Sequence, residues 1–365
     1  MRAAILEQAG EPIVIRDDVD IIEPRSGEVR VAVKYCGICH SDLSQVDGTF
    51  VPTEPIILGH EAAGVVESMG PGVEHLAVGD HVVLTPAPPC GHCYYCVRNE
   101  PQLCLNTHAV FTNTFADGQT GLSREGKPIL RGLGMAGFAE YVVTQASGAV
   151  KIPADVPLEH ACVIGCAMQT GVGAVFNTAN VEKGASVLIM GLGGVGMAAV
   201  QGARISGATT IIVSDPVAAR RELAMQLGAT HCVDPINENL VEQCMHLTEV
   251  GVDYAFETAG VAALISDGVN ATRSGGLTVC VGAPGLEAKL VIDPAVIFAS
   301  TEKKLCGCFL GSCNSLYEIP RLIRLYQAGV LDLASMISDI RPLAEINQAM
   351  DDMKAARGLR TVLQI

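Results

Sequence analysis

The segment at residues 187–215 places the tightest constraint on how this chain can fold. Residues 187–190 form a short apolar run, which is typical of a parallel strand buried on both faces. Three glycines follow with the spacing G-x-G-x-x-G, at Gly191, Gly193 and Gly196. A helical stretch and a second apolar run at 211–213 come next, and the segment ends on Asp215. This order of strand, glycine turn, helix and strand predicts a doubly wound α/β sheet.

The same segment predicts a dinucleotide site. In such a motif the first glycine permits a sharp turn, the second lets a pyrophosphate approach the backbone, and the third lets the helix pack against the strand. The helix start, including Gly194 and Val195, offers free N–H groups to phosphate. Asp215 is placed to accept both hydroxyls of an adenosine ribose, and it favours NAD over NADP because a 2′-phosphate would meet its charge. The alternative is a tight turn that binds no ligand.

Length and composition limit the class of protein. A chain of 365 residues with 49% hydrophobic and 17% charged residues is expected to form two domains, each with its own core. The net charge of −15 argues against nucleic acid or an anionic membrane surface as the main partner. No apolar run is long enough for a membrane span, and the N-terminus lacks a signal-peptide core. We therefore expect a soluble, cytoplasmic protein.

Fourteen cysteines in such a chain indicate metal ligands and buried thiols rather than disulfides. Four of them are separated by gaps of two, two and seven residues: Cys90, Cys93, Cys96 and Cys104. Four thiolates complete a tetrahedral zinc shell and leave no open position, so this site is expected to be structural. Iron–sulfur ligation is the main competitor. Zinc is favoured because one compact segment supplies all four ligands, and His92 is expected to be a solvated neighbour.

A second candidate metal site begins with Cys39 and His60, each at the end of an apolar run. Both are ligands that zinc takes, and Asp42 is expected to orient the imidazole of His60. Cys166 is the candidate third ligand. Cys162, one helical turn earlier, fits by spacing alone.

The remaining segments complete a two-part architecture. In residues 1–35 apolar and polar residues alternate in short runs, which is typical of antiparallel strands. Residues 105–140 are polar and glycine-rich, which predicts a long excursion rather than a core element. A helical segment is expected at 159–174. After Asp215 strands and helices alternate, and amphipathic helices at 319–328 and 346–355 precede a closing strand at 361–365.

With these motifs in this order, the chain resembles the zinc-dependent medium-chain alcohol dehydrogenases over essentially its whole length. The matching residues are Cys39, His60-Glu61, the four-cysteine cluster, Gly165-Cys166, 191–196, Asp215 and 360–363. The resemblance implies a mostly antiparallel, GroES-like catalytic domain formed by residues 1–167 and 310–365, with a Rossmann NAD-binding domain at 168–309. It also implies that Cys39, His60 and Cys166 hold a catalytic zinc with an open fourth position, which makes two zinc ions per chain.

The resemblance further implies oxidation of a primary alcohol to the aldehyde, or the reverse, by hydride transfer to NAD at a cleft between the domains. Ser41 resembles the family's hydroxyl that takes the alcohol proton, although a serine there by itself more often caps a helix. Ser44 stands where the best-known members have a relay histidine. A serine is no base near neutral pH, so the proton is expected to leave through ribose hydroxyls and water.

Several residues are expected to contact the cofactor or tune the metal. His40 fills a position often held by arginine at the pyrophosphate, and its charge changes near neutral pH, so cofactor affinity is expected to weaken as the pH rises. Arg360 matches an arginine that contacts the pyrophosphate. Glu61 is expected to modulate the zinc, or to form a buried ion pair with Arg360. Arg220 is expected beside the adenosine ribose, and Thr170 is also assigned to the cofactor.

The substrate pocket is expected to be lined mostly by apolar residues, several of which are small. By motif alignment it includes Phe50, Pro86, Ala109, Gly132, Leu133, Ala283 and Phe309. Pro86 and Gly132 fall where relatives tuned to small alcohols often carry large aromatic residues. This composition predicts bulky primary alcohols, aromatic or terpenoid, as better substrates than ethanol.

Two alternatives remain open at this point. A glutathione-dependent formaldehyde dehydrogenase would need a basic anchor for its charged substrate, and the named pocket positions are not basic. A zinc-free quinone reductase or a non-catalytic nucleotide-binding protein is disfavoured because Cys39, His60, Cys166 and Ser41 occur together. The stretch between Cys104 and Cys166 resembles the long form found in dimeric members, so we expect a homodimer in which residues 304–309 pair with their twin.

Overall fold

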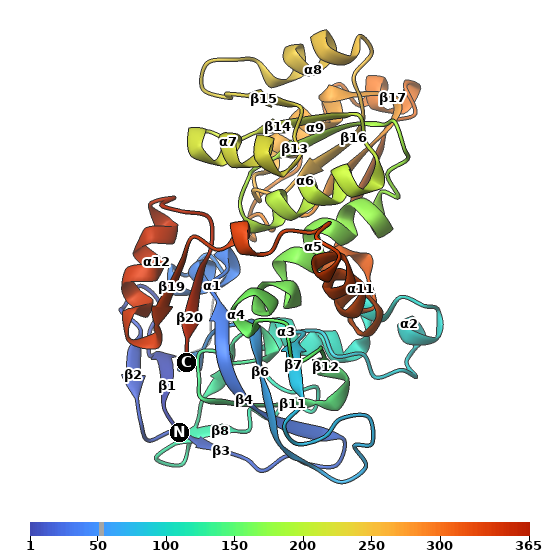
Figure 1. Cartoon of the computed structure of the whole chain (residues 1–365). Coiled ribbons are helices and arrows are strands. Elements are labelled where there is room, and N and C mark those ends of the chain that lie inside the picture. Colours follow the sequence, from blue (N-terminus) through green and yellow to red (C-terminus); the bar gives the residue numbers. More distant parts are fainter. Residues whose placement is uncertain (51–54) are drawn as a thin grey trace. The chain divides into compact units, whose positions relative to one another are not determined.

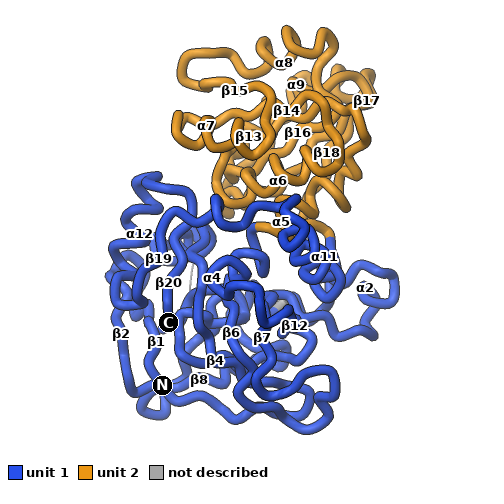
Figure 2. Tube along the Cα trace, in the orientation of Figure 1, with its two compact units in different colours: residues 1–167, 313–365 blue, residues 168–312 orange. Residues whose placement is uncertain are grey.

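The computed structural model describes residues 1–50 and 55–365, with only the backbone of His108. The chain divides into two compact units: unit 1 contains residues 1–167 and 313–365, and unit 2 contains residues 168–312 (Figure 2). Unit 2 is therefore one continuous insertion into a unit that both ends of the chain build. The chain returns to unit 1 at residue 313, where 310 was expected.

Unit 2 is built on a six-stranded parallel sheet with the order β15-β14-β13-β16-β17-β18 (Figure 1). Its strands are β13 (Ser186–Met190), β14 (Thr210–Ser214), β15 (His231–Val233), β16 (Val252–Glu257), β17 (Thr272–Cys280) and β18 (Lys304–Gly307). The strand order reverses between β13 and β16, which is the switch point of a doubly wound sheet. The predicted Rossmann architecture is confirmed.

Helices connect the strands of unit 2 because parallel neighbours need crossover connections. They are α6 (Gly194–Ser206), α7 (Ala218–Leu227), α8 (Leu240–Thr248), α9 (Ala262–Ala271) and α10 (Ala295–Ser300). Leu188, Ile212 and Ala255 belong to the buried core and come from three neighbouring strands. The central strands β13 and β14 read as nearly unbroken apolar runs because both of their faces are covered.

Unit 1 is mostly antiparallel. Its largest sheet has the order β12-β7-β6-β4-β20-β19, with β11 also paired to β4. The strands are β4 (Glu28–Gly37), β6 (Glu61–Met69), β7 (His81–Leu84), β11 (Tyr141–Gln145), β12 (Ala149–Lys151), β19 (Asp339–Pro342) and β20 (Thr361–Gln364). Strand β20 pairs antiparallel with β4, so the end of the chain completes a sheet that the first forty residues begin.

Smaller elements complete unit 1. Two further sheets contain β1 (Ala3–Leu6), β2 (Val14–Arg16), β5 (Ile56–Ile57) and β10 (Leu130–Arg131), and β3 (Asp20–Ile21), β8 (Leu122–Arg124) and β9 (Lys127–Pro128). The helices are α1 (His40–Val46), α2 (Tyr94–Val97), α3 (His108–Thr112), α4 (Leu158–Ala161), α11 (Ser315–Gln327) and α12 (Ile346–Lys354). The expected helix at 159–174 is instead α4, the 3₁₀ segment η5 (Cys162–Gly165) and α5 (Ala167–Gly173), which meet at Cys166.

The expectation that residues 105–140 lie outside the core is wrong. Ile129 and Phe138 belong to the main apolar core of unit 1. Arg131 is also buried: its guanidinium lies 3.9 Å from the centroid of the Phe115 ring and donates to the carbonyl of Val143 at 2.5 Å. An arginine among glycines indicates a surface loop by composition, whereas here aromatic stacking and a backbone carbonyl compensate for its burial.

Within residues 1–50 and 55–365, no single helix is long and apolar enough to cross a membrane. One bent pair, 158–165 with 167–178, passes that test by length and composition only.

Candidate metal and nucleotide sites

Strand register in unit 1 brings three distant segments to one place. Gly37 at the end of β4 pairs with Glu61 at the start of β6, and Val362 of β20 pairs with the same glycine. The residues just beyond these pairs therefore lie close together. Cys39 caps helix α1, and His60 immediately precedes β6.

The resulting cluster contains Cys39, His60, Glu61 and Cys166, whose potential ligand atoms all lie within 4.8 Å of one another. Zinc takes thiolate and imidazole ligands at about 2.0–2.3 Å in a tetrahedral shell, so atoms with this mutual spacing fit around one ion. Cys166 enters the cluster because the backbone leaves helical geometry there, with φ −135° and ψ −74°. The cluster thus has two thiols, one imidazole and one carboxylate.

Asp42 ties two of the ligand segments together. One carboxylate oxygen accepts the N–H of Cys39 at 3.0 Å, and the other accepts the N–H of Gly59 at 3.0 Å and lies 3.1 Å from His60 Nδ1. The side chain is almost fully buried. Because Nδ1 is held by Asp42, the free ring nitrogen of His60 is Nε2, as a metal-binding histidine requires.

The two candidate thiols near the break differ in their surroundings. The Sγ of Cys166 lies within 4.8 Å of the other ligand atoms of the cluster, and its hydrogen bond with Cys39 together with burial raises its pKa. Cys162 instead donates to the carbonyl of Glu159 at 3.3 Å, and burial raises its pKa. The position of its sulfur in the cluster therefore selects Cys166 over Cys162 as the third ligand, beside Cys39 and His60.

Glu61 forms the ion pair with Arg360 that the sequence suggested, and its carboxylate also lies within the cluster of possible metal ligands. Its Oε2 accepts from Arg360 at 2.9 Å, and the same guanidinium nitrogen donates to the carbonyl of Ile38 at 2.9 Å. Its Oε1 has no hydrogen-bond partner among the described residues. Burial raises the pKa of Glu61 to about 7, although Arg360 opposes that shift. The carboxylate is therefore part of an ion pair and a member of the metal cluster at once.

Helix α1 presents two further candidates. Ser41 Oγ lies 3.9 Å from Cys39 Sγ, so the hydroxyl is beside a metal ligand. His40 is exposed at the first position of the helix, whereas Ser44 is buried on its inner side.

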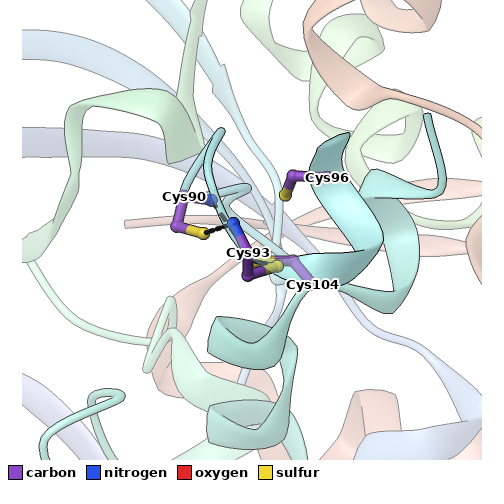
Figure 3. A group of neighbouring side chains, drawn as sticks. All are labelled: Cys90, Cys93, Cys96 and Cys104. Atoms are coloured by element: carbon purple, nitrogen blue, oxygen red, sulfur yellow. Dashed lines mark hydrogen bonds between the residues drawn. The ribbon is translucent and has the colours of Figure 1, made fainter. Parts of the chain in front are cut away.

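The four-cysteine cluster lies in a lobe of unit 1 formed by residues 90–104, which follow β7 and precede α3 in the sequence; Figure 3 shows the four side chains. The sulfurs of Cys90, Cys93, Cys96 and Cys104 all lie within 4.8 Å of one another. Backbone N–H groups point at them: Cys93 N–H donates to Cys90 Sγ at 3.3 Å, and Cys90 N–H donates to Cys104 Sγ at 3.2 Å. Hydrogen bonds from the backbone of Cys96 and Leu105 lower the pKa of Cys93 to about 6.

Such N–H donors stabilise thiolates, which are the form that binds metal. The lobe therefore fits a tetrahedral ion with four sulfur ligands and no open position. His92 is exposed and its Nδ1 lies 2.8 Å from the carbonyl of Cys90, as expected for a neighbour that does not bind the ion.

In unit 2 the glycine turn has the geometry that a dinucleotide needs. Gly191 has φ +89°, and an added Cβ would lie 2.8 Å from the side chain of Ala259. At Gly196 an added Cβ would lie 1.9 Å from the carbonyl oxygen of Gly191. At Gly193 it would meet no described atom within 4 Å. The first and third glycines thus permit close packing, and the second leaves open space where a pyrophosphate approaches.

Asp215 does more than the sequence indicates. Its two carboxylate oxygens accept the N–H of Leu192 at 2.7 Å and of Val217 at 2.8 Å, so it fastens the glycine turn to the next loop. Arg221, which the sequence argument passed over, donates to the carbonyl of Asp215 at 2.6 Å. Arg220 is half-buried on α7, and Thr170 is buried on α5.

Comparison with known proteins identifies the family of this chain. Residues 25–154 match the model of the alcohol dehydrogenase GroES-like domain, and residues 194–328 match that of the zinc-binding dehydrogenase domain. Alcohol dehydrogenase 2 of Solanum tuberosum is 38% identical over 372 residues, which cover 99% of this chain and 96% of the relative. The chain belongs to the zinc-dependent medium-chain alcohol dehydrogenases.

Two solved structures of the family are similar over the whole chain. Benzyl alcohol dehydrogenase from Acinetobacter calcoaceticus is 33% identical with a TM-score of 0.94, covering 100% of this chain and 99% of that one. A putative zinc-binding dehydrogenase from Sinorhizobium meliloti 1021, bound to NADP, is 30% identical with a TM-score of 0.83 and the same coverage. These likenesses support an alcohol dehydrogenase that uses zinc and a nucleotide cofactor.

The predicted pocket positions of this alcohol dehydrogenase fall in both units. In unit 1, Pro86, Ala109 and Gly132 are buried, and Phe50 and Leu133 are half-buried. In unit 2, Phe309 is half-buried and Ala283 is exposed. The segments of Ala109 and Leu133 meet because helix α3 packs on the 3₁₀ turn η3 (Gly132–Gly134).

Proposed function

We propose that this protein oxidises a bulky primary alcohol, aromatic or terpenoid, to its aldehyde with NAD, or catalyses the reverse reduction. The observation that carries the proposal is the buried cluster of Cys39, His60 and Cys166, with the hydroxyl of Ser41 3.9 Å from Cys39 Sγ. Metal ligands beside a hydroxyl able to move a proton are what alcohol oxidation needs.

When bound, zinc supplies a Lewis acid that acidifies the alcohol hydroxyl, and the nucleotide supplies the hydride acceptor. The protein's own residues hold the ligands and move the proton. Asp42 fixes the tautomer of His60, and Ser41 Oγ takes the proton from the alcohol oxygen. Ser44 is not a base, so the next acceptor after Ser41 would be supplied by a ribose hydroxyl of the bound cofactor or by water. Two zinc ions per chain are part of this proposal, one in each cluster.

The preference for NAD is proposed from Asp215, since its carboxylate would repel a 2′-phosphate. His40 and Arg360 are proposed at the pyrophosphate, with Arg220 and Thr170 as further cofactor contacts. One relative is bound to NADP, so the cofactor ratio has to be measured for this chain.

The substrate class is proposed from the small residues Pro86, Ala109 and Gly132 at positions assigned to the pocket. A relative that acts on benzyl alcohol supports the same class. We expect kcat/KM with NAD to be at least about tenfold higher for benzyl alcohol or a longer alcohol than for ethanol. A substrate panel run beside zinc analysis tests this. A higher kcat/KM for ethanol would contradict the substrate class while leaving the alcohol dehydrogenase activity intact.

We also propose a homodimer formed at β18, the edge strand of the sheet in unit 2. The adjoining segment, residues 286–297, exposes apolar side chains, including Leu286 and Val296, which are 76% and 69% exposed. An unpaired strand edge beside exposed apolar surface favours association with a second copy.

A further inference from the structure

Glu257 occupies a distinctive place in unit 2. It is the last residue of β16 and pairs with Met190, the last residue of β13, on the two strands that flank the switch point. Ligands of doubly wound sheets bind outside the carboxyl ends of strands at this point. A carboxylate at such a strand end is therefore next to the nucleotide crevice.

The side chain of Glu257 is fully buried and holds the loop that follows it, residues 258–261. Its Oε1 accepts the N–H of Ala259 at 2.8 Å and of Val261 at 3.2 Å. Its carbonyl oxygen accepts the N–H of Val281 at 2.8 Å and of Gly282 at 2.9 Å, from the loop that follows β17, residues 281–284. One residue thus anchors both loops.

The two loops are packed against each other around the carboxylate. An added Cβ at Gly282 would lie 2.1 Å from the backbone nitrogen of Gly260 and 2.7 Å from Glu257 Oε2. Thr258 continues the contact to the glycine turn, because its hydroxyl donates to the carbonyl of Gly191 at 2.6 Å. Glu257 therefore lies at the junction of three backbone segments at this edge of the sheet.

Burying a carboxylate at this position costs free energy, and the strand does not need a carboxylate in order to form. Burial raises the pKa of Glu257, and Oε2 has no hydrogen-bond partner among the described residues. An apolar side chain would suit the end of a covered parallel strand better. The need to hold the loop N–H groups of Ala259 and Val261 explains why a carboxylate is found at this position.

The sheet assigns these loops to one part of the cofactor. Strands β13, β14 and β15 with Asp215 form the half that takes the adenosine side, so β16, β17 and β18 form the half that takes the nicotinamide side. We propose that Glu257 is a positioning residue that sets the loops 258–261 and 281–284 for the nicotinamide end of the cofactor. This inference rests on the proposed use of NAD.

The test compares binding of NADH with binding of ADP-ribose, which lacks nicotinamide. NADH affinity is read from the fluorescence of NADH itself, and ADP-ribose affinity from its displacement of NADH. In E257A the N–H groups of Ala259 and Val261 lose their acceptor, so we expect about tenfold weaker NADH binding and less than about threefold weaker ADP-ribose binding. E257Q keeps an acceptor and is expected to bind both ligands as the native protein does.

D253N is the matched control. Asp253 lies near the opposite end of β16, where its carboxylate accepts the N–H and the hydroxyl of Ser186, both at 2.8 Å. Its substitution disturbs a similar anchor away from the crevice and is expected to leave both affinities unchanged. G282A is a second variant, in which the added methyl displaces the loops while Glu257 stays; we expect the same selective loss of NADH.

Equal losses of NADH and ADP-ribose affinity in E257A, or native NADH affinity in that variant, would overturn the positioning role. If E257A does not fold, G282A decides by the same comparison. A native protein that binds neither ligand would overturn the proposed cofactor, and the positioning role with it.

Discussion

Cys162 and Cys166 lie one helical turn apart in sequence, yet only Cys166 reaches the metal cluster. The difference comes from the backbone, since η5 ends at Gly165 and the chain turns at Cys166 before α5 begins. Spacing along an expected continuous helix cannot reveal that break. What the sequence does contain is the ligand chemistry, because thiolate and imidazole are both groups that zinc takes as ligands.

Substitution of each cysteine in turn therefore tests which of the two binds the metal. We expect C166S to lose the catalytic zinc and to retain one zinc per chain, because a neutral hydroxyl is a poor replacement for a thiolate. C162S is the matched control and should retain two zinc ions, since its thiol donates to the carbonyl of Glu159. Metal analysis of purified protein after dialysis measures both. One zinc in C162S and two in C166S would reverse the assignment.

Asp215 illustrates how a residue's role extends beyond its motif. The spacing from the glycine turn predicts a ribose acceptor, but it does not show that the same carboxylate holds the N–H groups of Leu192 and Val217. Substitution of this residue is therefore expected to have two effects. One acts on cofactor choice, and the other acts on the position of the glycine turn.

We expect D215A to narrow the ratio of kcat/KM between NAD and NADP by at least about tenfold, mainly by reducing the value for NAD. The value for NADP should rise little, because the turn that receives its pyrophosphate loses an anchor. D234N is the control: Asp234 contacts Arg221 at 3.2 Å but not the turn, so its ratio should not change. An unchanged ratio in D215A would remove Asp215 from cofactor selection.

At the scale of elements, the four-cysteine lobe has little apolar core, so we expect its order to depend on a bound ion. Helix α2 contains no buried residue, and Tyr94, Val97 and Leu105 are exposed. With few apolar contacts to hold the lobe, a bound ion and the N–H donors to its thiolates have to supply the order.

Removing one ligand should therefore unfold the lobe without removing the catalytic zinc. We expect C104S to contain one zinc per chain, to lower Tm by on the order of 10 °C, and to become susceptible to trypsin at Arg98. C232S, at an exposed cysteine outside both clusters, should behave as the native protein does. Native Tm and two zinc ions in C104S would show that the lobe does not need the metal.

Elements could be predicted well where local signals agree. The amphipathic helix expected at 346–355 and the strand expected at 361–365 lie within one residue of the bounds of α12 and β20, because the periodicity of apolar residues is clear in both segments. The prediction for residues 105–140 was wrong because the polar, glycine-rich composition of this stretch hides buried residues, such as those at 135–139, that follow neither a strand nor a helix period. Arg131 is held by the Phe115 ring and a distant carbonyl, and no periodic pattern encodes that arrangement.

For the whole molecule, the split of unit 1 follows from one pairing that local sequence does not contain. Strand β20 completes the sheet next to β4, and Arg360, just before β20, is thereby delivered to Glu61. The order of motifs, and the family that it resembles, indicated this closure; local periodicity alone predicted only a terminal strand. The metal cluster therefore depends on both ends of the chain.

The homodimer is the remaining prediction at this scale. The N–H of Cys308 donates to the carbonyl of Cys280 on β17. Since the backbone N–H groups along a strand point alternately to its two sides, the N–H of Leu305 points away from β17, toward the open edge of β18. We expect the native protein to have twice the chain mass of 38.1 kDa in solution, and L305P to be a monomer because proline removes a donor that the twin strand needs.

Light scattering coupled to gel filtration measures the mass of each variant. H231P is the matched control, since His231 lies on β15 at the other edge of the same sheet and should leave the dimer intact. The exposed apolar segment supplies an independent variant: V296K should weaken the dimer, because a charge would be buried against a second copy. A native tetramer, or a dimer that survives both L305P and V296K, would show that β18 is not the interface.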